Sequence, residues 1–173
     1  MVFVLILNSH STALAHPSSI YVTLFQSRPR VDTLFLRAPF VITNPVRAVY
    51  SEGLFEIVDE GRAIRVVQVN GKKRRVILRA PHVVISDRAK QAIEIGPDLE
   101  HMRKYYGQLT VSRRSPDRLT RRSGGLNVVN LIDSFNYVAS VVGGETTPAF
   151  GKEALKAHAV LVYTRLSPKG RNP

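Results

Sequence analysis

Short runs of alternating apolar and polar residues fill the chain from Ser19 to about Ile95 and indicate β-strands. The runs are rich in β-branched and aromatic residues, and Pro, Gly and Asn separate them. We expect strands at residues 20–25, 31–36, 40–43, 54–58, 63–69, 74–78 and 82–85. No helical period interrupts these runs, so this region is predicted to form a meander of antiparallel strands.

Turn residues refine this picture. Asn70-Gly71 lies between two apolar runs and predicts a tight hairpin, because both residue types tolerate positive φ. Two further strands are expected at residues 105–111 and 126–131. Between them Ser112–Gly125 is rich in Arg, Ser, Pro and Gly, which is typical of a solvated loop.

Helical spacing occurs only near the C-terminus. Asp133–Ser134 is expected to cap a helix that Gly143–Gly144 would stop. A second helix is predicted at Lys152–Leu166, because its apolar residues recur every three or four positions and share one face. Those residues are Leu155, Ala159, Val162 and Leu166. The pattern predicts an α+β fold, with a mainly antiparallel β N-terminal region followed by a strand–helix–helix segment.

Charge narrows the class of partner. The chain of 173 residues has 25 Lys and Arg against 13 Asp and Glu, a formal net charge of +12. Such a charge attracts polyanions, among them nucleic acid, anionic lipid and the phosphate- and carboxylate-rich bacterial wall. The basic residues cluster at 72–75, at 113–114, and at Arg118 with Arg121 and Arg122. These clusters can be solvated turns, a surface that docks on anionic wall polymers, or a nucleic-acid surface.

Other classes of chemistry find little support. The chain has no cysteine, which excludes disulfides, thiolate metal sites and a cysteine nucleophile. The five histidines lack metal-ligand spacing, and no dinucleotide or phosphate-binding loop occurs, so neither a metal nor a cofactor is expected. No aromatic-interleaved RNA motif or recognition helix accompanies the basic clusters, so nucleic acid is not the expected partner.

The N-terminus suggests export. Met1–Leu7 is an apolar run, and Ala13–Ala15 is a small-x-small pattern typical of a signal-peptide cleavage site. Residues 1–15 are therefore interpreted as a signal-peptide remnant, with a first β-strand as the alternative. We expect an exported protein of the cell envelope or extracytoplasmic space.

Three stretches in the second half of the chain carry a family resemblance. They are Tyr105–Leu109 (YYGQL), Leu126–Asn130 (LNVVN) and Glu153–Val160 (EALKAHAV). Together they resemble the stage II sporulation protein D family (SpoIID/LytB domain), whose helix reads EALKAQAV. The resemblance divides the chain into a β-rich region at 16–100 and a catalytic-motif segment at 101–173.

By this resemblance the protein would be a lytic transglycosylase of peptidoglycan. The family's glutamate falls on Glu145, which would act as the catalytic acid. Tyr105, Tyr106, Lys156 and His158 would bind substrate. The implied partners are peptidoglycan glycan strands and anionic cell-wall polymers, with a wall amidase as a further candidate. From its position after Gly143–Gly144 alone, Glu145 would be interpreted as a solvated loop residue or a helix cap. The catalytic assignment therefore depends on the resemblance.

Several positions differ from the family pattern. Thr146 replaces a methionine, His158 a glutamine, and Phe150–Gly151 a tryptophan-proline pair. His158 can be an acid/base partner, a metal ligand or a packed residue, and Tyr137 is interpreted as a core aromatic.

Family members usually continue beyond the equivalent of Pro173, so a truncated or divergent member is expected. Two alternatives stay open: a non-catalytic wall-binding relative, and a small basic nucleic-acid-binding protein.

Overall fold

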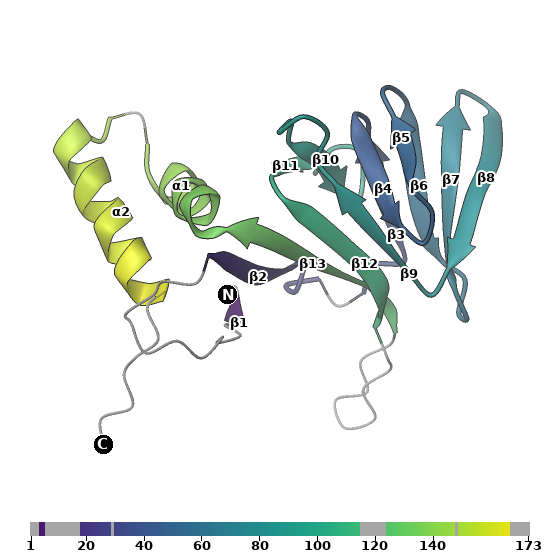
Figure 1. Cartoon of the computed structure of the whole chain (residues 1–173), viewed down its shortest axis with the longest axis horizontal. Coiled ribbons are helices and arrows are strands. Elements are labelled where there is room, and N and C mark those ends of the chain that lie inside the picture. Colours follow the sequence, from purple (N-terminus) through teal and green to yellow (C-terminus); the bar gives the residue numbers. More distant parts are fainter. Residues whose placement is uncertain (1–3, 6–17, 29, 115–123, 148, 167–173) are drawn as a thin grey trace, which may run out of the picture. The chain divides into compact units, whose positions relative to one another are not determined.

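A computed structural model describes residues 4–5, 18–28, 30–114, 124–147 and 149–166. It confirms the α+β fold, with antiparallel strands in two sheets and two helices at the end of the chain (Figure 1). The chain divides into two compact units. One contains residues 22–131, and the other contains residues 4–21 and 132–173. Nearly all of the proposed signal segment lies outside the described residues, as do Arg118, Arg121 and Arg122.

The strands form one sheet of seven and one of six. The seven-stranded sheet has the order β1 (Val4–Leu5), β2 (Ser19–Leu24), β13 (Gly125–Asp133), β12 (Gln108–Arg114), β9 (His82–Ser86), β4 (Phe40–Asn44) and β5 (Ala48–Tyr50). The six-stranded sheet has the order β11 (Arg103–Tyr105), β10 (Ile93–Gly96), β3 (Thr33–Arg37), β6 (Leu54–Asp59), β7 (Ile64–Asn70) and β8 (Lys73–Ala80). Strand β1, residues 19–21 of β2 and residues 132–133 of β13 belong to the second unit.

The hydrophobic core of the first unit contains side chains from both sheets. Leu34 and Leu36 of β3 are fully buried in the same cluster as Ile42 of β4. Phe40 of β4 and Phe55 of β6 meet edge to face, with ring centroids 4.9 Å apart. Such aromatic pairs add about 0.5–1.5 kcal/mol to the gain from burial. The two sheets are thus held together by apolar packing, as the alternating pattern requires.

Most strand predictions are confirmed, with local corrections. The strand expected at 105–111 is broken into β11 and β12, because Gly107 between them has φ +92°. The residues Ser112–Arg114 belong to β12 rather than to a loop. Arg113 is paired with the carboxylate of Asp59 at 2.7 Å and is not a solvated cation. Strands β5 and β10 were not predicted.

The predicted hairpin joins β7 to β8, but its turn lies one residue later. Asn70 is paired with Lys73 in the ladder, so the turn residues are Gly71 and Lys72. Gly71 has φ +59°, which glycine adopts at little cost. Because the turn lies one residue later than predicted, Lys73 is opposite Asn70 and Arg75 is opposite Gln68.

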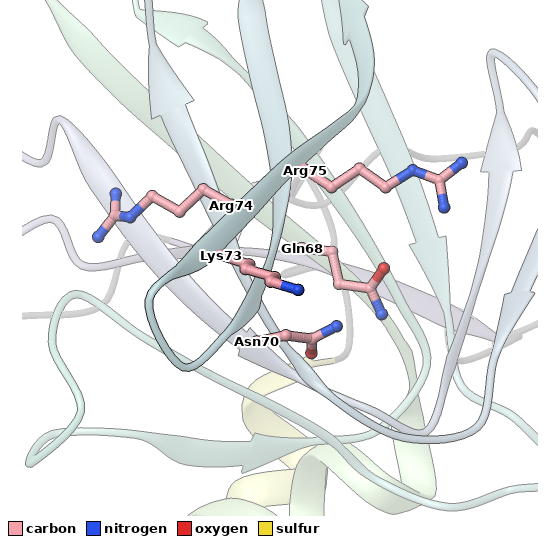
Figure 2. Close-up of a pocket in the computed structure, with 5 residues that line it drawn as sticks. All are labelled: Gln68, Asn70, Lys73, Arg74 and Arg75. Atoms are coloured by element: carbon pink, nitrogen blue, oxygen red, sulfur yellow. The ribbon is translucent and has the colours of Figure 1, made fainter.

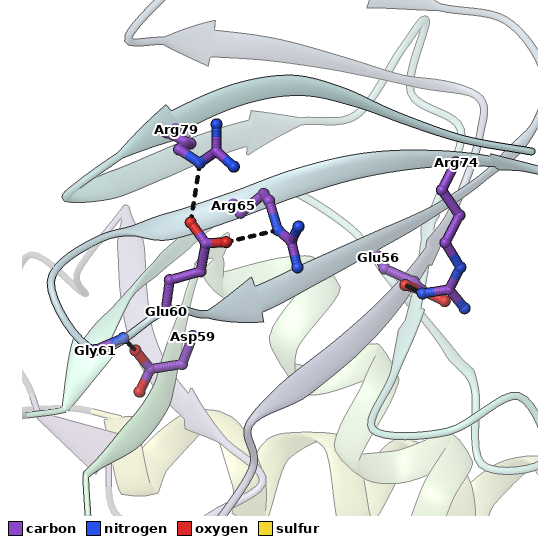
Figure 3. A network of polar contacts seen from close by, with 7 residues as sticks. All are labelled: Glu56, Asp59, Glu60, Gly61, Arg65, Arg74 and Arg79. Carbon is purple, nitrogen blue, oxygen red and sulfur yellow. Dashed lines mark hydrogen bonds and ion pairs between the residues drawn. The ribbon is translucent and has the colours of Figure 1, made fainter.

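Carboxylates of β6 and its following turn neutralise part of the basic charge of β7 and β8 (Figure 3). Glu60 contacts Arg65 at 2.9 Å and Arg79 at 3.0 Å. Glu56, one of two buried polar residues in the described part of the chain, contacts Arg74 at 2.8 Å. Buried carboxylates are costly unless paired, so the Glu56–Arg74 contact satisfies a charge that the sheet would otherwise isolate.

The second unit contains α1 (Ser134–Glu145) and α2 (Lys152–Leu166). Asp133 caps α1 as predicted, accepting a hydrogen bond from the Asn136 amide at 2.9 Å. The prediction that Gly143–Gly144 stops α1 is wrong, because the helix runs through both glycines to Glu145. The bounds of α2 are those predicted. Neither helix in the described ranges has the length and apolar content required to cross a bilayer.

Candidate active site on helices α1 and α2

Glu145 and His158 contact each other within the second unit. Glu145 is the last residue of α1, and His158 lies near the middle of α2. The Nε2 atom of His158 is 3.0 Å from Oε2 of Glu145. A carboxylate oxygen can only accept, so a hydrogen bond between the two side chains requires the hydrogen to be on Nε2. His158 thus has a carboxylate neighbour, and its role as an acid/base partner stays a prediction.

The local helix chemistry explains why Glu145 benefits from a partner. The C-terminal end of α1 carries the negative end of the helix dipole, which disfavours a carboxylate there. The His158 ring lies against this carboxylate, with Nε2 3.0 Å from Oε2. The Glu145 side chain is 61% exposed and that of His158 is 20% exposed. The apolar residues next to Glu145 in the sequence predict a sheltered carboxyl group. The Glu145 side chain is instead mostly exposed to solvent.

Tyr137 belongs to the same electrostatic environment. Its pKa is raised, mainly because burial disfavours the phenolate and also because the Glu145 carboxylate repels that charge. The phenol therefore keeps its hydrogen at neutral pH. Tyr137 is only partly buried, so its interpretation as a core aromatic holds in part.

An apolar groove of about 660 Å³ lies between α1 and α2. This volume is within the usual range of small-molecule sites. Its lining includes Phe135, Val142, Thr146, Phe150, Leu155 and Lys156. Glu145 and His158 are not among the lining residues, but Thr146 follows Glu145 directly in the chain. Glu145 is thus the chain neighbour of a residue that lines the groove.

The exposed aromatic residues of this groove were not identified as site residues from sequence. Phe135 is 78% exposed and Phe150 is 47% exposed. Phe135 follows directly on the Asp133–Ser134 cap, a position where an apolar side chain need not face a core. An aromatic residue in the first turn after a predicted helix cap is the sequence feature that could have identified Phe135 as a site residue.

The other residues implied by the resemblance are less closely grouped. Lys156 lines the groove and also pairs with Glu153 at 2.8 Å on the surface of α2. Tyr105 and Tyr106 belong to the first unit. Tyr105 packs edge to face on Phe25 with centroids 6.4 Å apart, and burial raises its pKa. Tyr106 is 43% exposed. Within the second unit the structure thus brings Glu145 and His158 together, while Lys156 lines the groove, whose lining contains neither of them.

No cluster of three or more potential metal ligands occurs among the described residues. Glu145 and His158 form a two-residue contact at the end of α1. Their arrangement can hold a carboxyl group in one orientation beside an apolar groove. Such an arrangement suits proton transfer to a bound neutral ligand.

Comparison with known families gives a match to the C-terminal part of the chain. The SpoIID model, described as stage II sporulation protein, matches residues 122–172. The matched segment contains α1, α2 and the Glu145–His158 contact. No curated protein and no solved structure matches the chain. The match supports assigning residues 122–172 to the SpoIID family, and it suggests a function related to sporulation and the cell wall.

Proposed function

We propose that the protein cleaves peptidoglycan glycan strands by lytic transglycosylation, with Glu145 as the proton donor. The observation that supports this most is the position of Glu145. Glu145 lies within the matched segment, and by the sequence resemblance it falls on the family's glutamate. Nε2 of His158 is 3.0 Å away, and the next residue, Thr146, lines an apolar groove.

The chemistry requires a single carboxyl group. Glu145 donates its proton to the glycosidic oxygen between N-acetylmuramic acid and N-acetylglucosamine, and the bond from that oxygen to the anomeric carbon breaks. The 6-hydroxyl oxygen of the muramic acid then bonds to the anomeric carbon. Its proton passes to the Glu145 carboxylate, which restores the acid. No water and no second carboxylate takes part, in contrast to ordinary glycoside hydrolysis.

His158 and the groove supply the remaining requirements. The Nε2–H of His158 can hold the carboxylate in place after it loses its proton, when the charge is greatest. The exposed rings of Phe135 and Phe150 offer faces on which the apolar sides of sugar rings can stack. Lys156 at the same groove can attract acidic groups of the wall.

The product of the reaction provides the test. The full chain is incubated with purified glycan strands, and 1,6-anhydro-muramic acid ends are measured by mass spectrometry. The wild type should generate these ends, and Glu145→Gln should abolish them. Glu100→Gln is a matched control, since it makes the same change at an exposed glutamate of the first unit and should leave the product unaffected. Undiminished product from Glu145→Gln would refute the assigned role.

A non-catalytic wall-binding relative is the second candidate. The exposure of Glu145, at 61%, and its absence from the lining of the groove favour this alternative. In that case the wild type would sediment with purified walls yet generate no anhydro ends. Glu145→Gln would then bind walls as well as the wild type does.

The proposed substrate places the protein outside the cytoplasm. If the Ala13–Ala15 pattern is a cleavage site, the mature protein recovered from the cell envelope should begin at His16. N-terminal sequencing of that protein is the measurement. A protein found in the cytosol with Met1 intact would argue against export.

A wall amidase is the proposed functional partner. An amidase removes stem peptides and leaves bare glycan, which would enter the groove more readily. Glycan strands pretreated with an amidase should therefore be cleaved faster than untreated strands. Equal rates on both substrates would argue against such a partner.

A further inference from the structure

Next to its turn, the β7–β8 hairpin has one face of polar and cationic side chains. Gln68 is paired with Arg75, and Asn70 is paired with Lys73. Residues directly opposite in an antiparallel ladder project to the same side, and residues two apart on a strand do so as well. Gln68, Asn70, Lys73 and Arg75 therefore form one surface, which we name the hairpin face (Figure 2).

Arg74 differs from its two neighbours. It leaves β8 on the side opposite to Arg75, as Figure 2 shows, and its guanidinium is paired with the buried Glu56 at 2.8 Å. Lys73 and Arg75 are exposed, and neither forms an ion pair with any other described residue. The hairpin face thus carries two cations whose charge the described part of the chain leaves uncompensated.

The surroundings of these cations suit an anionic ligand. The hairpin face borders a depression of about 540 Å³, lined by Gln68, Asn70, Lys73, Arg74 and Arg75. The amide groups of Gln68 and Asn70 make no hydrogen bond to another described residue and can donate to a ligand. A guanidinium, an ammonium and two amides are donors that match the oxygen atoms of phosphate.

We propose that the hairpin face binds the phosphodiester groups of an anionic wall polymer of the poly(glycerol phosphate) type. This inference rests on the proposed function for the location of the protein at the wall. Lys73 and Arg75 lie two residues apart on β8, which separates their Cα atoms by about 6.8 Å. Successive phosphates of such a polymer are joined by a flexible three-carbon bridge, so two of them can contact the two cations.

The hairpin face lacks the features of a nucleic-acid surface. None of the five residues lining the depression is aromatic, so bases would find no ring on which to stack. The cations lie on a strand at the edge of a sheet and not on a helix that could enter a major groove. A polymer without bases requires neither feature.

Binding of a defined polymer tests the proposal. The full chain is titrated with a fluorescent glycerol-phosphate oligomer at several salt concentrations, and fluorescence anisotropy is measured. The double variant Lys73→Gln/Arg75→Gln should bind about tenfold or more weakly at low salt. Its plot of log affinity against log salt should lose about two units of slope, roughly one for each cation.

The opposite edge of the same sheet offers a matched control. Arg103 and Lys104 are exposed neighbours on β11, and Arg103→Gln/Lys104→Gln removes the same charge. At about 0.15 M salt, where the Debye length is about 8 Å and distant charges are largely screened, this control should bind within about twofold of the wild type. Lys73→Arg/Arg75→Lys keeps both charges and should restore most of the binding.

Two results would overturn the proposal. An equal loss of affinity in both double variants would show that net charge, and not the hairpin face, governs binding. Tighter binding of single-stranded DNA with the same number of phosphates, also lost in Lys73→Gln/Arg75→Gln, would assign the face to nucleic acid. Thermal unfolding of each variant shows whether it remains folded.

The outcome is separable from that of the proposed function. Glu145→Gln should bind the glycerol-phosphate oligomer as tightly as the wild type, even though it forms no anhydro ends. Lys73→Gln/Arg75→Gln should cleave short soluble glycans at the wild-type rate. Failure of catalysis therefore leaves the binding result intact, and failure of binding leaves the catalytic result intact.

Discussion

The Nε2 atom of His158 lies 3.0 Å from the Oε2 atom of Glu145, and this contact links α2 to the end of α1. Glu145 is mostly exposed, and within the described residues this is the one hydrogen-bond or ion-pair contact that its side chain makes. An exposed glutamate without a partner samples many rotamers. His158 is therefore the residue that orients the proposed acid.

Replacing His158 should impair catalysis through orientation. We expect His158→Ala to lower kcat by about 10–100-fold with little change in KM, because a misplaced acid costs rate more than binding. His158→Gln should recover much of the loss, since its amide can still donate to Glu145. His82→Ala, at an exposed histidine of β9, is the control and should leave kcat unchanged.

The cap of α1 should make the stability of the second unit sensitive to acid. The pKa of Asp133 is lowered, first because the Asn136 amide donates to its carboxylate. A lowered folded pKa means that this stabilisation is present above the ordinary carboxyl value of about 4 and is lost as pH falls through the folded value. Asp133→Ala should cost about 1 kcal/mol at pH 7.

The measurement for Asp133 is urea unfolding at pH 7 and pH 3, followed by helical circular dichroism. The gap between wild type and Asp133→Ala should narrow at pH 3. Asp133→Asn can still accept the amide hydrogen and should lose only a few tenths of a kcal/mol. A gap that stays constant across this pH range would contradict the capping role.

Two glycines should respond to alanine in opposite directions. A Cβ at Gly96 would lie 2.6 Å from the backbone oxygen of His101, so Gly96→Ala must shift main chain and should cost about 1–3 kcal/mol. A Cβ at Gly144 would meet nothing within 4 Å. Because Gly144 lies inside α1, Gly144→Ala should stabilise the helix by up to about 1 kcal/mol. Thermal unfolding of both variants tests the opposite signs.

The Glu56–Arg74 contact should behave as a coupled pair. Arg74→Gln leaves the carboxylate of Glu56 buried and poorly compensated, and should cost about 1–3 kcal/mol. The double variant Glu56→Gln/Arg74→Gln removes both charges and should cost less than the sum of the single variants. A double-mutant cycle of unfolding free energies measures the difference. Strict additivity would show that the contact contributes nothing.

The β-strands were predictable because burial imposes alternation on them. Every strand predicted from residue 20 to residue 85 is present, with shifts of at most a few residues at the ends. Strands β5 and β10 are short and were missed, since three or four residues cannot display a period. The break at Gly107 was missed as well, because an apolar run does not reveal where one glycine reverses its φ.

Helix α1 shows where local rules fail. Paired glycines usually end a helix, yet Gly143 and Gly144 remain helical. The Thr146 amide donates to the carbonyl of Val142 at 3.1 Å, and its hydroxyl donates to the same oxygen at 2.6 Å. These two bonds give the Val142 carbonyl, in the last turn of α1, two hydrogen-bond donors. The sequence alone does not reveal that the Thr146 hydroxyl donates to the Val142 carbonyl, so this helix end could not be predicted.

The candidate site was predictable only as a set of residues. The motif placed Glu145 and His158 in the same segment, but a sequence separation of thirteen residues says nothing about their contact. That contact depends on how the helices pack within the second unit. The groove with Phe135 and Phe150 likewise arises from the packing of α1 on α2.

The six-stranded sheet carries adjacent cations at both of its borders, Arg103 and Lys104 on β11 and Lys73 to Arg75 on β8. Two copies that approached border to border would bring like charges face to face before any backbone hydrogen bond could form. The molecule therefore discourages its own stacking into ribbons while remaining attractive to anionic material. Concentrated preparations should stay dispersed in low salt and begin to associate when polyvalent anions mask these borders.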